Sequence, residues 1–133
     1  MYTAFSNSGS MITPYLIYKD DPSAEVWINQ AISKEHSSLL TEDLKAVVNN
    51  PAGSGYAAHR TDMELAGKTG TAELKSEQGT TGQEIGWFSV FTTDPSASKP
   101  VLLTSMVESV EDKGGSTYVV KKDAAVLDSY FGS

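Results

Sequence analysis

Hydrophobic residues recur at helical spacing in the first half of the chain. They come three or four positions apart, as on one face of an amphipathic helix: Leu40, Leu44, Val47 and Val48. Ser33 is a suitable N-cap, and Glu35 lies in the first turn, where a negative charge is favourable. The pattern therefore predicts a helix over residues 34–49 that ends before Pro51.

From residue 63 onward the apolar residues come instead in short β-prone runs. These runs predict strands at residues 63–74, 85–93 and 101–107, joined by polar or turn-like segments. A parallel crossover needs a dozen or more residues, so connections this short predict a three-stranded antiparallel meander. Residues 85–91 are apolar on both alternating faces, which predicts a central strand covered on both sides. Its large side chains, Trp87, Phe88 and Phe91, are expected in the sheet core.

Two shorter features complete the pattern. Residues 11–18 are β-prone, but Pro14 cannot donate a ladder hydrogen bond, which limits this run to an edge or isolated strand. Residues 108–113 are polar and are expected to form a solvated loop. After it, helical spacing returns and predicts a terminal helix across the sheet, with a stripe formed by Val120, Ala124, Leu127 and Phe131. The fold class is α+β, with an N-terminal helical part.

Composition and charge narrow the possible functions. A net charge of −7, from 10 Lys and Arg against 17 Asp and Glu, provides no basic surface for phosphates, so no nucleic-acid partner is expected. No apolar run reaches the ~20 residues that span a bilayer. The chain has no cysteine, and neither His36 nor His59 belongs to a cluster of ligands. We therefore predict no metal and no cofactor.

One strand-like run combines a cation, hydroxyls and a glycine: Lys68, Thr69, Gly70 and Thr71. Glycine weakens a strand, and its presence there suggests that another backbone or a ligand approaches closely. A phosphate-binding P-loop would place its first glycine at Asp62 and would need a helix directly after Thr69, and the sequence has neither. The plain structural alternative is an edge strand with a surface lysine and β-favouring threonines.

These residues resemble the Lys-Thr-Gly box of penicillin-binding proteins and serine β-lactamases. Other segments match the class B transpeptidases in order and spacing: Asn7-Ser8-Gly9-Ser10-Met11 with Pro14, Gly53-Ser54-Gly55 with Ala57-Ala58, residues 66–72, and Gly86-Trp87-Phe88. Residues 67–75 and 85–88 are especially similar to the low-affinity, β-lactam-tolerant branch of Gram-positive bacteria. The resemblance implies that residues 1–133 are the C-terminal part of a penicillin-binding transpeptidase domain, with a β-lactamase/transpeptidase-like fold.

The resemblance also implies an activity. Such an enzyme is acylated on a serine by the D-Ala-D-Ala end of a peptidoglycan stem peptide, or by a β-lactam, and cross-links the bacterial cell wall. Lys68 would then provide positive potential at the substrate carboxylate, and the Thr69 and Thr71 hydroxyls would bond it. Gly70 would admit the substrate backbone, and the Thr71 backbone N–H would be an oxyanion-hole donor. The parent protein would be extracytoplasmic, anchored to the membrane by a segment outside this chain.

The other two boxes of the family are missing. The single Ser-x-x-Lys begins at Ser96, in a proline-flanked turn downstream of the Lys-Thr-Gly box, and is regarded as accidental. No Ser-x-Asn occurs. The chain is thus expected to be inactive alone and to need the upstream half of the domain. In the family fold, the strand at residues 101–107 pairs with a strand from the missing upstream sequence. Its edge would therefore lie open here, and we expect self-association through Val101 to Met106 or pairing with a supplied upstream piece.

Two other functions share this box. A β-lactam sensor domain is acylated in the same way but transmits a signal, although the pattern at residues 7–14 favours the enzyme. A standalone carboxylate-binding protein would keep Lys68, Thr69 and Thr71, but it would lack the opposite wall of its site.

Overall fold

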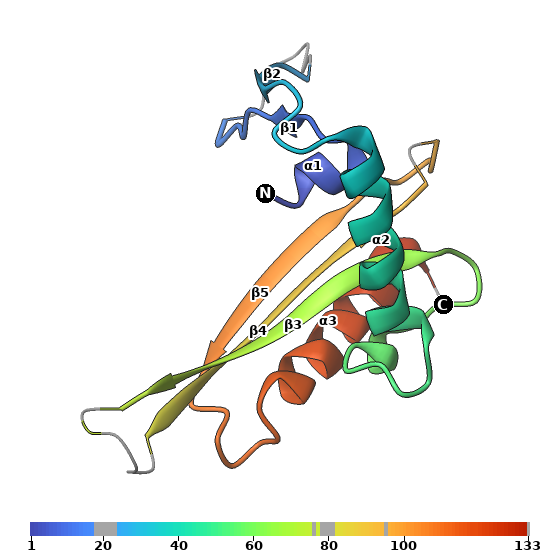
Figure 1. Ribbon diagram of the computed structural model, residues 1–133. Coiled ribbons are helices and arrows are strands. Elements are labelled where there is room, and N and C mark those ends of the chain that lie inside the picture. Colours follow the sequence, from blue (N-terminus) through green and yellow to red (C-terminus); the bar gives the residue numbers. More distant parts are fainter. Residues whose placement is uncertain (18–23, 76, 78–81, 95, 133) are drawn as a thin grey trace. The chain divides into compact units, whose positions relative to one another are not determined.

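The structure is a computed structural model that describes residues 1–17, 24–75, 77, 82–94 and 96–132 (Figure 1). The chain divides into two compact units, Met1–Asp43 and Leu44–Ser133, which are described separately. No helix among the described residues is long and apolar enough to cross a membrane.

Helix α2 (Lys34–Asn49) runs through the boundary between the units and has the predicted limits. Its N-cap is Ser33, whose hydroxyl accepts a hydrogen bond from the His36 backbone N–H at 3.2 Å. The pKa of Glu35 is lowered, first by a bond from its own backbone N–H and then by the Ser33 hydroxyl. Local spacing and capping therefore define this helix, as the sequence indicated.

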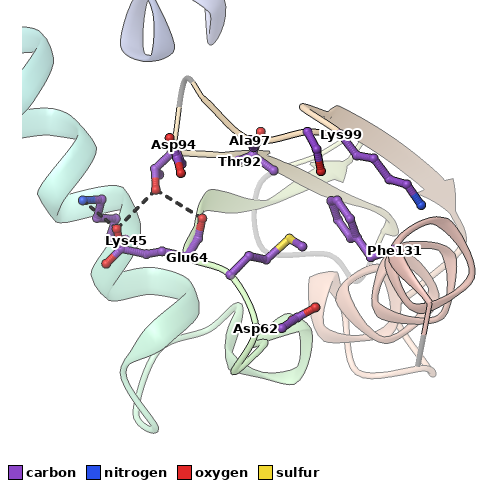
Figure 2. Close-up of a pocket in the computed structure, with 11 residues that line it drawn as sticks. Lys45, Asp62, Glu64, Thr92, Asp94, Ala97, Lys99 and Phe131 are labelled. Atoms are coloured by element: carbon purple, nitrogen blue, oxygen red, sulfur yellow. Dashed lines mark hydrogen bonds and ion pairs between the residues drawn. The ribbon is translucent and has the colours of Figure 1, made fainter.

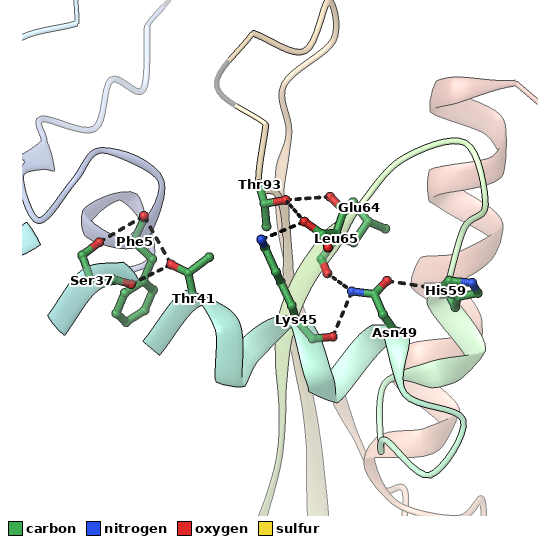
Figure 3. Close-up of polar contacts among 9 residues, drawn as sticks. All are labelled: Phe5, Ser37, Thr41, Lys45, Asn49, His59, Glu64, Leu65 and Thr93. Atoms are coloured by element: carbon green, nitrogen blue, oxygen red, sulfur yellow. Dashed lines mark hydrogen bonds and ion pairs between the residues drawn. The ribbon is translucent and has the colours of Figure 1, made fainter. Parts of the chain in front are cut away.

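The first unit contains helix α1 (Thr3–Ser6) and a two-stranded antiparallel sheet of β1 (Met11–Ile12) and β2 (Val26–Ile28). The strand predicted over residues 11–18 is wrong in length, because β1 ends two residues before Pro14; Tyr18 lies outside the described residues. The sequence analysis did not predict β2. The Ser37 hydroxyl lies 3.2 Å from the Phe5 carbonyl oxygen, which links α1 to the first turn of α2 (Figure 3).

The second unit is built on a sheet of β3 (Leu65–Leu74), β4 (Gln83–Thr92) and β5 (Leu102–Glu108). The strand order is β3-β4-β5 and both pairings are antiparallel, which confirms the predicted meander with shifts of one or two residues at its ends. Helix α3 (Ser116–Phe131) lies along one face of the sheet (Figure 1), and the short helix η1 (Tyr56–Ala58) precedes β3.

The core of this unit lies between the sheet and α3. Its buried residues come from the strands, α3, α2 and η1: Leu65, Phe88, Val90, Val119, Val120, Leu127, Val48 and Ala58. Ala124 and Phe131 pack against them, so the predicted stripe of the terminal helix is confirmed.

Two predictions about burial are wrong. Trp87 is 42% exposed, although Phe88 and Phe91 are buried at 0% and 2%. Strand β4 is central, but the face opposite α3 is not covered along its whole length. Val110, in the segment predicted to be a solvated loop, is 0% exposed. Its backbone N–H donates to the Glu84 carbonyl at 3.1 Å, which draws the loop onto the sheet.

One buried polar group lies in the contact between α3 and the sheet. Asp123 is 2% exposed, and its Oδ2 atom has no hydrogen-bond partner among the residues that the structure describes. Burial raises the pKa of this carboxyl, and a hydrogen bond with Ser105 partly offsets the rise. Because the pKa is raised, this group favours folding below its unfolded pKa, and that contribution falls as pH rises through the folded pKa.

Gly86 permits the close approach of α3 to β4. A Cβ atom at this position would lie 2.8 Å from a methyl group of Val119 and 3.2 Å from one of Val110. Both valines are fully buried, so they have little room to move.

We expect Gly86→Ala to lower the free energy of unfolding by about 1–3 kcal/mol, because the added methyl overpacks the contact with α3. Gly70→Ala is the matched control, since a Cβ atom there meets only the Cβ of Trp87, at 3.6 Å. Denaturant unfolding of both variants tests this. Equal losses of stability in the two variants would contradict the packing described here.

Candidate active site

The three residues of the Lys-Thr-Gly box and the following Thr71 lie on β3, but their side chains divide between its two faces. In the β3–β4 register, Thr71 is opposite Gly86, whose missing side chain would point at α3. Residues alternate along a strand, so Thr69 and Thr71 face α3, whereas Lys68 and Gly70 face the other side. The sequence analysis placed these side chains at one site, and the structure places them on opposite faces of the same strand.

The backbone of β3 has a free edge. The Thr93 N–H donates to the Glu64 carbonyl at 3.3 Å, and the ladder continues from there without a bulge. In an antiparallel pair the hydrogen-bonded positions alternate, so even-numbered residues of β3 bond β4. The N–H and C=O groups of Thr69 and Thr71 therefore point away from β4. No other strand among the described residues pairs with this edge.

Two side-chain contacts agree with this assignment. The Leu65 carbonyl, which shares the free edge, accepts a hydrogen bond from Asn49 Nδ2 at 2.8 Å (Figure 3). The Thr69 carbonyl accepts one from Lys68 Nζ at 2.7 Å. The Lys68 ammonium therefore lies at the free edge, although the Lys68 side chain leaves the strand on the face opposite α3.

The edge combines a positive charge with a backbone donor. Lys68 is exposed, and the outward N–H of Thr71 follows three residues along the same strand. An ammonium and a free N–H at one edge suit an anionic ligand that extends along the strand, as an added strand would. Among the described residues no group of three or more His, Asp or Glu side chains could hold a metal ion.

The two glycines of the motif differ in what surrounds them. A Cβ on Gly67 would lie 2.7 Å from the Ser89 carbonyl oxygen and 3.1 Å from the Phe88 ring, so internal packing explains this glycine. A Cβ on Gly70 would meet only one described atom within 4 Å. Packing within the described part of the chain therefore does not account for glycine at residue 70.

Ser54 is a neighbour of the site that sequence reasoning did not single out. Its hydroxyl lies 2.7 Å from the Thr69 hydroxyl, and either atom can be the donor. The segment Gly53-Ser54-Gly55 belongs to the family pattern, but no role was attached to it. Asn49 was also missed, because nothing in the sequence distinguishes it from other residues at the end of a helix.

The two other motif interpretations can be compared with the structure. The sequence analysis rejected a P-loop, and the structure agrees, because Thr69 lies within β3, which continues to Leu74 in place of a helix. At the Ser-x-x-Lys sequence, the Ser96 hydroxyl and N–H both bond Asp94 Oδ1, at 2.6 and 2.8 Å. Lys99 Nζ contacts the Tyr130 carbonyl at 3.4 Å. Ser96 therefore lies in an exposed turn and does not begin a helix.

His59 has a structural role. Its Nδ1 lies 3.1 Å from Asn49 Oδ1, and its ring stacks on Tyr56 with 5.3 Å between centroids. It therefore holds Asn49, which in turn bonds the Leu65 carbonyl.

The predicted absence of a metal and a cofactor stays a prediction.

A pocket of about 610 Å³ lies at the opposite end of the sheet, around the start of β3 and the end of β4 (Figure 2). Its carboxylates already have partners. The pKa of Glu64 is lowered by its bond from Lys45 at 2.8 Å, that of Asp62 by Arg60, and that of Asp94 by Ser96. The three carboxylates of this pocket are bonded within the chain, and we assign the pocket no ligand.

Comparison with known proteins defines the family. Residues 1–127 match the penicillin binding protein transpeptidase domain, and the chain belongs to that family. It is 42% identical over 122 residues to penicillin-binding protein 3 of Bacillus subtilis, covering 91% of this chain. The predicted class B resemblance and the predicted fold are thus confirmed; the low-affinity branch stays a prediction.

Two solved structures agree with the fold. The transpeptidase domain of Burkholderia pseudomallei penicillin-binding protein 3 matches 96% of this chain and 39% of its own, at 20% identity and a TM-score of 0.72. The D,D-transpeptidase domain of a peptidoglycan glycosyltransferase from Eggerthella lenta matches 96% of this chain and 29% of its own, at 26% identity and a TM-score of 0.66. The chain spans 18% of the length of the Bacillus relative.

Asn49 offers a test of how the free edge is held. We expect Asn49→Ala to destabilise the domain by about 0.5–1.5 kcal/mol, because the Leu65 carbonyl loses its donor. Asn49→Asp should cost about 1–3 kcal/mol, since a carboxylate would face the carbonyl oxygens of Leu65 and Lys45. Denaturant unfolding measures both. A smaller loss for the Asp variant than for the Ala variant would contradict the assigned bond.

Proposed function

We propose that the free edge of β3 is the substrate-carboxylate wall of a serine-type D,D-transpeptidase that cross-links peptidoglycan and is acylated by β-lactams. Lys68 provides positive potential at the carboxylate, and Thr69 and Thr71 hydrogen-bond it. Gly70 lets the substrate backbone approach the strand, and the Thr71 backbone N–H is one of two oxyanion-hole donors. Membership of the transpeptidase family supports this proposal.

One observation carries the proposal. The Lys68 ammonium and the outward N–H of Thr71 lie on the same free edge, with Gly70 between them in the sequence. A stem peptide is an extended chain that ends in a carboxylate, so it can lie along this edge as an added strand. A side chain at residue 70 would lie beside that ligand. Within the described residues, a Cβ atom there would meet only the Cβ of Trp87, so internal packing does not require a glycine.

The chemistry follows from these positions. A serine oxygen attacks the carbonyl between the two D-Ala residues, forms an ester with the penultimate one, and releases the terminal D-Ala after a proton is transferred to its nitrogen. An amine of a neighbouring strand then attacks the ester, forms the cross-link and returns the proton to the serine. The Thr71 N–H stabilises the negative oxygen in both steps, and loss of such a donor costs ~10²–10³ in rate. Lys68 holds the carboxylate and can help to relay the proton.

The nucleophile must come from sequence outside these 133 residues. The chain has neither a helix that opens with Ser-x-x-Lys nor a Ser-x-Asn. We therefore assign residues 1–133 to the C-terminal part of the domain, inactive alone and complemented by its upstream half. The parent would act outside the cytoplasm, held to the bacterial membrane by a segment outside this chain.

The intact mass of the chain after treatment with benzylpenicillin tests its place in the domain. We expect no adduct on this chain alone, because it lacks the nucleophile. After refolding together with the upstream segment of the parent, we expect an adduct on that segment. An adduct on this chain would place a nucleophile within residues 1–133 and overturn the proposal.

Lys68→Ala tests the carboxylate wall itself. In the domain that contains this chain, we expect the rate constant for acylation by benzylpenicillin to fall by about 10–150-fold, the value of a hydrogen bond to a charged group. Lys75→Ala is the matched control, because Lys75 is also exposed but lies beyond the end of β3 and pairs with Glu73. Equal effects of the two substitutions would argue against a site at Lys68.

A further inference from the structure

We infer that Ser54 is a positioning residue for the substrate carboxylate, acting through Thr69. The inference rests on the proposed function, because it assigns to Ser54 the orientation of one of the proposed carboxylate donors. Its basis is the contact of 2.7 Å between the two hydroxyl oxygens, which joins a turn to the Lys-Thr-Gly strand across fifteen residues of sequence.

The turn that carries Ser54 is held firmly. The Gly53 N–H donates to the Asn50 carbonyl at 2.7 Å, and the Gly55 N–H donates to the Val47 carbonyl at 3.0 Å. A Cβ on Gly53 would lie 2.2 Å from the Val47 carbonyl oxygen, so the turn packs directly on the end of α2. Ser54 thus lies on a short segment fixed on both sides.

Gly55 ties the same turn to the core. A Cβ at this position would lie 3.2 Å from the ring of Phe88 and 3.3 Å from a methyl group of Val47. Phe88 is fully buried, and it lies opposite Thr69 in the β3–β4 register. The turn and the strand therefore share one support, which keeps the Ser54 and Thr69 hydroxyls within hydrogen-bond distance.

The direction of this hydrogen bond decides what Thr69 can do. A hydroxyl has one proton to donate and two lone pairs that accept. When Ser54 donates to Thr69 Oγ1, the Thr69 proton is free to donate to a carboxylate. When Thr69 donates to Ser54, that proton is used. A bound anion favours the first arrangement, because each hydrogen bond in a chain that ends on a charge polarises the next.

Ser54 thereby fixes the orientation of the Thr69 hydroxyl, which Thr69 alone would not do. Thr69 faces α3, and Lys68 faces the other side, so the two reach a ligand at the free edge from different faces. With Ser54 as a fixed donor, the Thr69 side chain is held in one rotamer and its own proton stays free to point toward the ligand. Ser54 need not touch the substrate, which makes it a positioning residue and not a catalytic one.

The test compares two probes in the domain that contains this chain: benzylpenicillin, and its methyl ester, which lacks the carboxylate charge. We expect Ser54→Ala to reduce the acylation rate constant for benzylpenicillin by about five- to tenfold, the value of one hydrogen bond, with the rate for the ester unchanged. Ser54→Thr should restore benzylpenicillin acylation to within about twofold, because it keeps the hydroxyl.

Two further variants make the result specific. Thr69→Val removes the second hydroxyl and keeps the side-chain shape, so it should reproduce the loss for benzylpenicillin. The double variant Ser54→Ala with Thr69→Val should lose no more than Thr69→Val alone. Ser129→Ala, on the exposed side of the last turn of α3, is the matched control for a serine-to-alanine change. If Ser54→Ala fails to fold, Ser54→Thr and Thr69→Val still test the inference.

The outcomes separate this inference from the proposed function. One outcome is faster acylation of the wild-type protein by benzylpenicillin than by the ester, with the same preference in Ser54→Ala. That result would overturn the role of Ser54 but not the proposed carboxylate wall. Equal losses for both probes would also overturn it, because they would indicate a purely structural effect. No preference in the wild-type protein would mean that the proposed carboxylate wall itself is wrong.

Discussion

The one-sided pairing of β3 is the constraint on which the rest of the second unit depends. A strand has two rows of backbone hydrogen-bonding groups, and β4 takes only the row of even-numbered residues from β3. The other row, which includes Thr69 and Thr71, stays open to the edge. Open edges usually recruit other strands, and here side chains occupy part of the row. Asn49 binds the Leu65 carbonyl and Lys68 binds that of Thr69.

The open edge requires a rigid support behind it, and α3 provides this support. The helix approaches β4 closely enough that Gly86 has no room for a side chain, and Val119 and Val120 fill the space against Phe88 and Val90. The end of α2 and the turn at residues 53–55 pack on the same core. The strand that carries the site is thus held by its helix-facing side, and Lys68 on its other face remains exposed.

The failures of sequence reasoning have separate physical causes. Residues 11–18 have strand propensity, but β1 is only two residues long because its partner, β2, is short and Pro14 follows. Trp87 was expected in the core because aromatic residues in a central strand are usually covered. It lies on the face opposite α3, which is covered at Ser89 and Phe91 but not at Trp87. Val110 looked like part of a polar loop, and its burial follows from a long-range bond to Glu84.

The sequence by itself determined the longer helices and strands, because helix caps, spacing and turn residues act between near neighbours. It located α2, the meander and the stripe of α3, and it identified the Lys-Thr-Gly box and the family. Only the tertiary structure decided which edge of β3 is open, which box residues share a face, and that Ser54 meets Thr69. These contacts join residues far apart in the sequence, and they are set by the packing of the turn, α2 and α3 around one core. Local sequence patterns therefore do not predict these contacts.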